Sequence, residues 1–100
     1  MSEPDPVTEA LGMLDPDVWE IWSAPGILRV SRVWTDDTLD TLIVLSSETA
    51  YGRRDHRTNG LVWHCRGSVL TVVSALAALP APGEPGAPSE PLTDRTDDLT

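Results

Sequence analysis

The residues best suited to chemistry lie together at positions 51–66, YGRRDHRTNGLVWHCR. This stretch holds four of the seven arginines, both histidines and the only cysteine. Its first part belongs to a polar, basic connection over residues 49–60, which is longer than a compact hairpin needs, and such loops often carry function. We therefore expect an Arg/His-rich loop that binds a partner, with the following contact residues: Tyr51 as an anchor, Arg53, Arg54 and Arg57 as electrostatic contacts, and His56.

The charge of the whole chain indicates which partner such a loop would attract. The formal net charge is −9, with a pI near 4.3, whereas residues 51–66 are locally positive. Phosphate and anionic lipid would be repelled by the molecule as a whole, which argues against membrane binding and disfavours nucleic acid. An acidic protein partner fits best. The alternative is a nucleic-acid-associated regulator that uses the same loop, with Arg29, Arg32 and Arg66 from neighbouring strands.

The sequence offers few side chains in patterns typical of catalytic or metal-binding sites. His56, His64 and Cys65 are the candidate zinc ligands, but on a strand His64 and Cys65 would project from opposite faces. Cys65 shares a face with Leu61 and Trp63, as a small core residue does, and no Gly-x-Ser-x-Gly elbow surrounds any serine. We expect a non-enzymatic protein without metal or cofactor.

The elements that must position the loop are three strands. Residues 27–34 alternate approximately between apolar and polar side chains, and residues 39–46 contain an uninterrupted apolar run typical of a central strand. Residues 35–38, Thr-Asp-Asp-Thr, have the composition of a turn between them. After the basic loop, Asn59-Gly60 signals a turn that leads into a third strand over residues 61–65.

Short helices are expected on either side of these strands. Asp5-Pro6 and Asp15-Pro16 are both helix-start signals, and the second predicts a helix over residues 16–23. That helix would present Trp19 and Trp22 as a partner or dimer surface. Residues 68–79 have helical spacing of apolar residues and a cap signal at Gly67-Ser68, although their β-branched residues leave a fourth strand as the alternative.

The predicted architecture is a small α+β two-layer sandwich: a three-stranded antiparallel sheet with N-terminal short helices, one C-terminal helix and a disordered Pro-rich tail. We divide the chain into an N-terminal arm (1–15), a single α+β domain (16–80) and a disordered acidic tail (81–100).

Domain size and cysteine content indicate how the protein assembles and where it is located. So small a domain buries a limited core, which favours self-association or a protein partner. A single cysteine allows no internal disulfide, and the N-terminus lacks the basic and apolar regions of a secretory signal, so we expect a cytoplasmic protein. The sequence thus predicts a non-enzymatic protein–protein interaction module whose partner and oligomeric state it does not specify.

Overall fold

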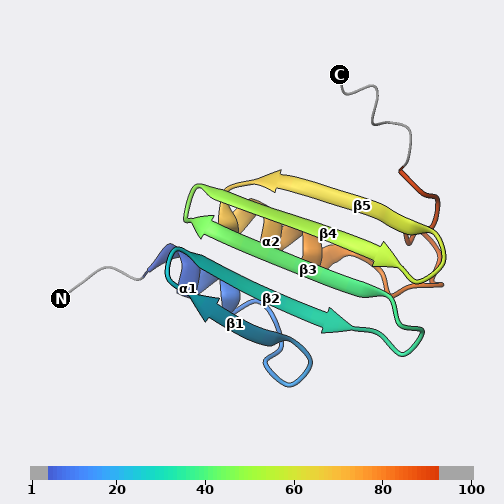
Figure 1. The fold of residues 1–100 in the computed structure, drawn as a ribbon, viewed down its shortest axis with the longest axis horizontal. Helices are drawn as coiled ribbons and strands as arrows, with labels where there is room; N and C mark the ends of the chain where they lie inside the picture. The colour runs from blue at the N-terminus through green and yellow to red at the C-terminus, as the bar shows by residue number, and fades with distance from the viewer. Residues whose placement is uncertain (1–4, 93–100) are drawn as a thin grey trace.

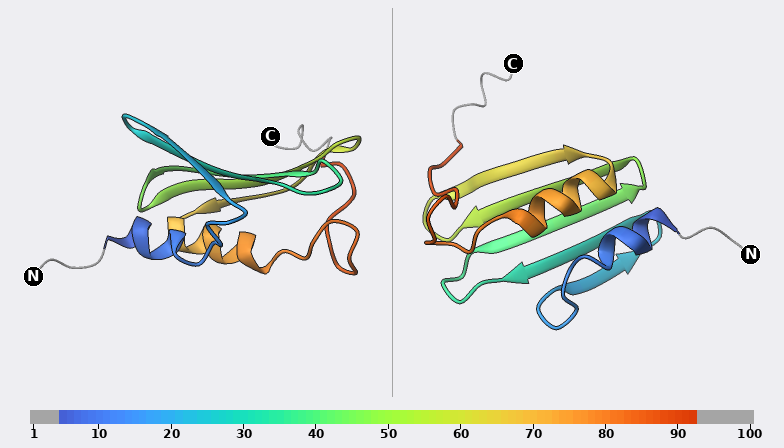
Figure 2. Two further views of the ribbon diagram at one scale, coloured as in Figure 1. Left: turned by 90° about the horizontal axis from the view of Figure 1, so that it is seen from below. Right: turned by 180° about the vertical axis from the view of Figure 1, so that it is seen from behind.

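The structure is a computed structural model that describes residues 5–92, and it is an α+β fold (Figure 1). A five-stranded antiparallel sheet has the simple order β1-β2-β3-β4-β5. The elements, in chain order, are α1 (Pro6–Leu11), β1 (Glu20–Ala24), β2 (Ile27–Val33), β3 (Leu39–Ser46), β4 (Thr49–His56), β5 (Gly60–Gly67) and α2 (Val69–Ala78). Both helices lie on the same side of the sheet (Figure 2, left).

The two helices begin where local signals predict. Asp5 caps α1 by accepting a hydrogen bond from the backbone N–H of Val7, and Pro6 occupies the first turn. Ser68 caps α2 by accepting from the N–H of Thr71. The helical interpretation of residues 68–79 is therefore confirmed, and the fourth-strand alternative at this position is wrong.

The predicted helix over residues 16–23 is wrong, because residues 16–19 are not helical and the second half of the segment belongs to strand β1. The Asp15 side chain accepts from the N–H of Asp17, and the Asp15 carbonyl accepts from the N–H of Trp19, so the Asp-Pro signal makes a turn. Pro25-Gly26 then forms the β1–β2 hairpin, where Gly26 adopts a φ of +80° that favours glycine.

The predicted basic loop is also wrong, because residues 49–56 form strand β4 in the interior of the sheet. It pairs with β3 on one side and β5 on the other. The alternation of buried and exposed residues in β4 is not visible in the sequence, because two of the positions that face the core hold Gly52, which has no side chain, and Arg54, which is charged. The sheet consequently has five strands instead of the predicted three.

Gly52 lies at a close contact between α2 and the sheet. A Cβ at this position would lie 2.8 Å from Cγ1 of Val72 and 3.3 Å from Cδ1 of Leu76, so the helix packs on bare backbone. The surrounding core joins both helices to the sheet, and its buried members are Ala10, Leu14, Trp19, Val30, Leu42, Val44, Ala50, Val69, Val72, Val73 and Leu76.

The described parts of the terminal regions contact the rest of the fold. In α1, Ala10 is buried in the common core, and α1 contacts α2. Residues 81–92 form turns and return to the start of β5, where the N–H of Leu92 donates to the carbonyl of Leu61 over 2.8 Å. The predicted division into arm, domain and tail stays a prediction, and the part of the tail at residues 93–100 lies outside the described residues. Within the described range, no helix is long and apolar enough to cross a membrane.

Candidate functional site

The two faces of the sheet differ in what covers them. Helices α1 and α2 pack on one face, called here the helix face (Figure 2). No element within residues 5–92 covers the opposite face, which we call the open face. A sheet face left uncovered in so small a fold is where an interaction site is expected.

One row of side chains crosses the open face through all five strands. The strand register places each member directly opposite the next, so the row is continuous from one edge of the sheet to the other. It contains two guanidinium groups among three apolar or aromatic side chains, in the order Trp22, Arg29, Ile43, Tyr51 and Arg66. We call this set the cross-strand row.

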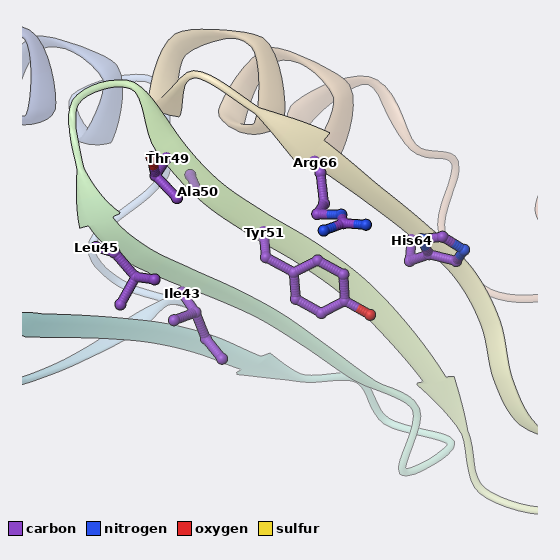
Figure 3. Close-up of a pocket in the computed structure, with 7 residues that line it drawn as sticks. All are labelled: Ile43, Leu45, Thr49, Ala50, Tyr51, His64 and Arg66. Carbon is purple, nitrogen blue, oxygen red and sulfur yellow. The ribbon is translucent and has the colours of Figure 1, made fainter. Parts of the chain in front are cut away.

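A groove lies at the β3–β5 side of the cross-strand row (Figure 3). It has a volume of about 410 Å³ and is lined by Ile43, Leu45, Thr49, Ala50, Tyr51, His64 and Arg66. In Figure 3, Arg66 and His64 on β5 flank the Tyr51 side chain, while Ile43 and Leu45 on β3 lie on its other side. The Tyr51 and His64 rings are 6.1 Å apart between centroids. Leu45 is 57% exposed, so the groove presents apolar surface to solvent.

The arginines of the cross-strand row have no carboxylate partner among residues 5–92. Arg29 lies 5.3 Å above the Trp22 ring, within the range of a cation–π contact, and Trp22 is itself 54% exposed. Arg66 forms no ion pair within the described range either. Two guanidinium groups are thus available on this face to bind carboxylates, which they do in a bidentate geometry.

The neighbouring row on the open face is polar. It consists of Glu20, Ser31, Thr41, Arg53 and His64. Arg53 differs from the free arginines because it binds Asp55 on its own strand, with Nη2–Oδ1 and Nε–Oδ2 distances of 2.6 and 2.8 Å. The hydrogen bond to Asp55 raises the pKa of Arg53. This pair lies beside the groove but supplies no uncompensated charge.

Arg54, predicted as a surface contact, is buried on the helix face and is unavailable to a partner. Its Nε and Nη2 donate to the two carboxylate oxygens of Asp40 at 2.7 and 2.8 Å, and both side chains are 1% exposed. Its Nη1 donates to the Pro80 carbonyl, and the Trp34 indole donates to Asp40. The prediction failed because consecutive residues of a strand face opposite sides.

His56, the last residue of β4, and Arg57, in the β4–β5 connection, were also predicted as contacts, and neither lines the groove. Arg57 is exposed and forms an ion pair with Asp37 at 3.3 Å. Nδ1 of His56 accepts from the backbone N–H groups of Thr58 and Asn59, so this ring closes the turn. All three arginines predicted as free contacts are therefore paired with carboxylates of the protein itself, which removes the basis for a solvated basic loop.

The two tryptophans predicted as one surface lie apart. Trp19 is 8% exposed and belongs to the core, whereas Trp22 lies on the open face as the first member of the cross-strand row. They do not share a helix, because the segment between them enters strand β1. A surface that includes Trp22 stays a prediction, and one that includes Trp19 is excluded by its burial.

No metal centre can be assembled from the predicted ligands. Cys65 packs partly buried against the core on the helix face, while His64 on the preceding position projects to the open face. Residues 5–92 contain no cluster of three or more His, Cys, Asp or Glu side chains that could hold a metal ion.

Sequence reasoning identified Tyr51 but missed the groove around it. Arg29 and Arg66 entered the prediction only through the nucleic-acid alternative, and Ile43 and Leu45 were assigned to the interior of a central strand. The available signal was the uninterrupted apolar run in residues 42–45: in a sheet with helices on one face, half of such a run must remain uncovered.

The fold and groove define the chain as a small compact α+β domain with an uncovered antiparallel sheet face. No protein-family model matches the sequence, and searches of the curated proteins and of the solved structures found no significant match.

Proposed function

We propose that this protein is a small non-enzymatic interaction module that binds an acidic protein segment on the open face of its sheet. The cross-strand row carries the proposal, because it combines exposed aromatic and apolar side chains with two guanidinium groups that lack a partner within residues 5–92. The bound segment has carboxylates for Arg29 and Arg66 and an apolar side chain for the groove beside Tyr51.

Charge complementarity favours an acidic partner over a second copy bound face to face. Two open faces in contact would bring the Arg29 and Arg66 guanidinium groups of both copies into one interface, and this accumulation of like charge is unfavourable. A carboxylate-bearing segment meets the opposite sign instead. The net charge of −9 confines this attraction to the open face, because the rest of the molecule repels acidic chains.

A second groove, on the helix face, differs from the open-face groove in a way that supports the open face as the binding site. It also has a volume of about 410 Å³, but it lies beside α1 and its lining contains no charged side chain: Thr8, Leu11, Gly12, Leu14, Pro16, Trp19, Ile21 and Val30. Nothing in that lining selects a partner by charge. The open-face groove combines apolar contact with charge recognition, as specific interfaces do.

The experiment that tests this proposal is fluorescence anisotropy at low salt with a labelled peptide that alternates Asp or Glu with Leu. A peptide with Lys in place of the acidic residues and a labelled oligo-dT serve as comparison ligands. We expect the acidic peptide alone to bind, with an affinity that falls as salt rises. Arg66→Gln should weaken binding about tenfold, in line with the loss of one charge-assisted hydrogen bond.

Arg57→Gln is the matched control, since it removes an equal charge from an exposed arginine outside the groove. It should change the affinity less than twofold. Equal losses in the two variants would show that only net charge matters and would contradict a site on the open face. Tighter binding of oligo-dT than of the acidic peptide would replace this proposal with the nucleic-acid alternative.

A further inference from the structure

The two guanidinium groups of the cross-strand row are separated by a fixed number of strands. Arg29 lies on β2 and Arg66 on β5, both exposed on the open face, and the register places Ile43 and Tyr51 between them. Neighbouring strands are about 4.8 Å apart, so the backbone positions of the two arginines are about 14 Å apart across the sheet. A segment that binds both arginines must therefore cross the strands.

An extended segment matches this separation at one spacing of its acidic residues. The side chains of an extended chain alternate between its two sides, so residues that face the sheet together are separated by an even number of positions. Separations of two, four and six positions correspond to about 7, 13 and 20 Å. Of these, a separation of four positions comes closest to the distance between the arginines.

The residue midway between two such carboxylates faces the sheet as well. It lies about 7 Å from either end, between the positions of Ile43 and Tyr51. Both of these side chains line the open-face groove, together with Leu45, so the environment of this residue is apolar. The two intervening residues face away from the sheet, and the site therefore sets no requirement on them.

The neighbouring polar row can bind the backbone of such a segment. An extended chain that crosses the strands directs its N–H and C=O groups sideways, along the strands. On that side, Ser31, Thr41 and His64 lie two positions from the cross-strand row, which corresponds to about 7 Å. Hydroxyl and neutral imidazole groups both donate and accept, so the backbone of a bound extended segment has polar partners there.

We infer that the partner segment binds in an extended conformation across the strands and has the pattern acidic-x-apolar-x-acidic, where x is any residue. This inference rests on the proposed function, because it specifies the partner of the same site. The acidic residues bind Arg29 and Arg66, and the apolar residue enters the groove between Ile43 and Tyr51. A peptide that strictly alternates acidic residues with leucine satisfies this pattern in part, because its carboxylates and its leucines face opposite sides.

The test uses three labelled peptides with capped termini and identical composition. Ser-Glu-Thr-Leu-Thr-Glu-Ser separates its glutamates by four positions, Ser-Thr-Glu-Leu-Glu-Thr-Ser by two, and Glu-Thr-Ser-Leu-Ser-Thr-Glu by six. Leucine is central in each, but in the first peptide alone it faces the same side as both glutamates. In fluorescence anisotropy at low salt, we expect the first peptide to bind about five- to tenfold more tightly than the others, because each of those loses one charge-assisted contact.

A second measurement assigns the contacts to the two arginines. Replacing one glutamate of the first peptide by glutamine should weaken its binding to the unaltered protein about five- to tenfold. This difference should disappear in Arg29→Gln or in Arg66→Gln, whichever variant removes the arginine that the replaced glutamate contacts. It should persist in Arg57→Gln, the matched control, because that exposed arginine lies outside the groove.

The outcomes separate this inference from the proposed function. Equal affinity for the three glutamate peptides, or tightest binding at a separation of two or six positions, overturns the pattern and leaves an acidic interaction site supported. A loss on glutamine replacement that persists in both Arg29→Gln and Arg66→Gln also overturns the pattern. No binding by any acidic peptide, the alternating one included, contradicts the proposed function and the pattern together.

Discussion

Arg53 and Arg54 are adjacent in the chain, yet they have opposite surroundings. Arg53 lies on the open face, partly exposed, and binds Asp55 two residues away. Arg54 lies on the helix face, almost fully buried, and binds Asp40 on the neighbouring strand. The strand pleat places them on opposite sides, and the packing of the helices on one side alone decides which of them is structural.

The same contrast holds for the two faces as a whole. On the helix face, the buried Arg54–Asp40 pair is tolerated because each of its groups has a further partner, the Pro80 carbonyl for Arg54 and the Trp34 indole for Asp40. On the open face, arginines remain without a carboxylate within residues 5–92. A buried charged group requires fixed partners within the protein, whereas an exposed charged group is solvated and stays available to a ligand.

Arg54→Met tests this contrast with the largest expected effect. It leaves the Asp40 carboxylate buried without its main partner, so we expect the free energy of unfolding to fall by about 3–5 kcal/mol, measured by urea denaturation. Arg53→Met, its matched control on the other face, should cost about 1 kcal/mol or less. Asp40→Leu combined with Arg54→Met should recover much of the loss. Equal costs for Arg53→Met and Arg54→Met would contradict the difference between the faces.

Gly52→Ala should lower the free energy of unfolding by about 1–3 kcal/mol, because the added methyl group would overpack the contact with α2. The close neighbour is Cγ1 of Val72, so a double-mutant cycle with Val72→Ala checks the cause by thermal or urea denaturation. The double variant should be more stable than the sum of the two single effects predicts. Strict additivity would show that this methyl group does not meet Val72.

Leu45→Ala should cost little stability, within about 0.5 kcal/mol, because this side chain is mainly exposed on the open face. Leu42→Ala, three residues earlier on the same strand but fully buried on the helix face, should cost about 2–5 kcal/mol. Urea denaturation measures both. The reverse order should hold for binding of the acidic peptide, where a folded Leu45→Ala protein loses affinity; unchanged affinity would exclude Leu45 from the interface.

The smallest expected effect is a pH dependence at Asp36 in the β2–β3 turn. The hydrogen bond from the backbone N–H of Thr38, at 3.0 Å, lowers the pKa of Asp36 below its value in the unfolded chain. A lowered folded-state pKa means that the stabilisation is present above the unfolded value, near 3.9, and is lost as pH falls through the folded value.

Asp36→Asn keeps the acceptor oxygen and removes the charge. The stability difference between the protein and this variant, from urea denaturation at several pH values, should therefore shrink as pH falls below about 4. A difference that stays constant from pH 7 to pH 3 would show that the charge contributes nothing.

The part of the fold that the sequence predicts is the part with local signals. Asp5-Pro6 and Ser68 place the helix starts, because capping groups act within one turn of the helix. The apolar patterns at β2, β3 and β5 identify strands for the same local reason. Of the residues predicted as contacts or as a partner surface, Trp22, Tyr51 and Arg53 lie on the open face, and Trp22 and Tyr51 belong to the cross-strand row.

The strands that were missed depend on neighbours distant in the sequence. Nothing local in β4 shows that Arg54 will be buried, because the carboxylate that permits it is Asp40 on another strand. In β1, the Asp15-Pro16 signal supports a turn as well as a helix, and pairing with β2 decides between them.

The amino-acid sequence by itself thus determined the helix caps, the turns, three of the strands and a strongly acidic chain with a local excess of arginine. The tertiary structure alone decided which arginines are free, because strand register sets their neighbours and one-sided helix packing sets their exposure. It brought five side chains from between positions 22 and 66 into a single row: Trp22, Arg29, Ile43, Tyr51 and Arg66. Long-range pairing brings such residues together, and no local pattern records it.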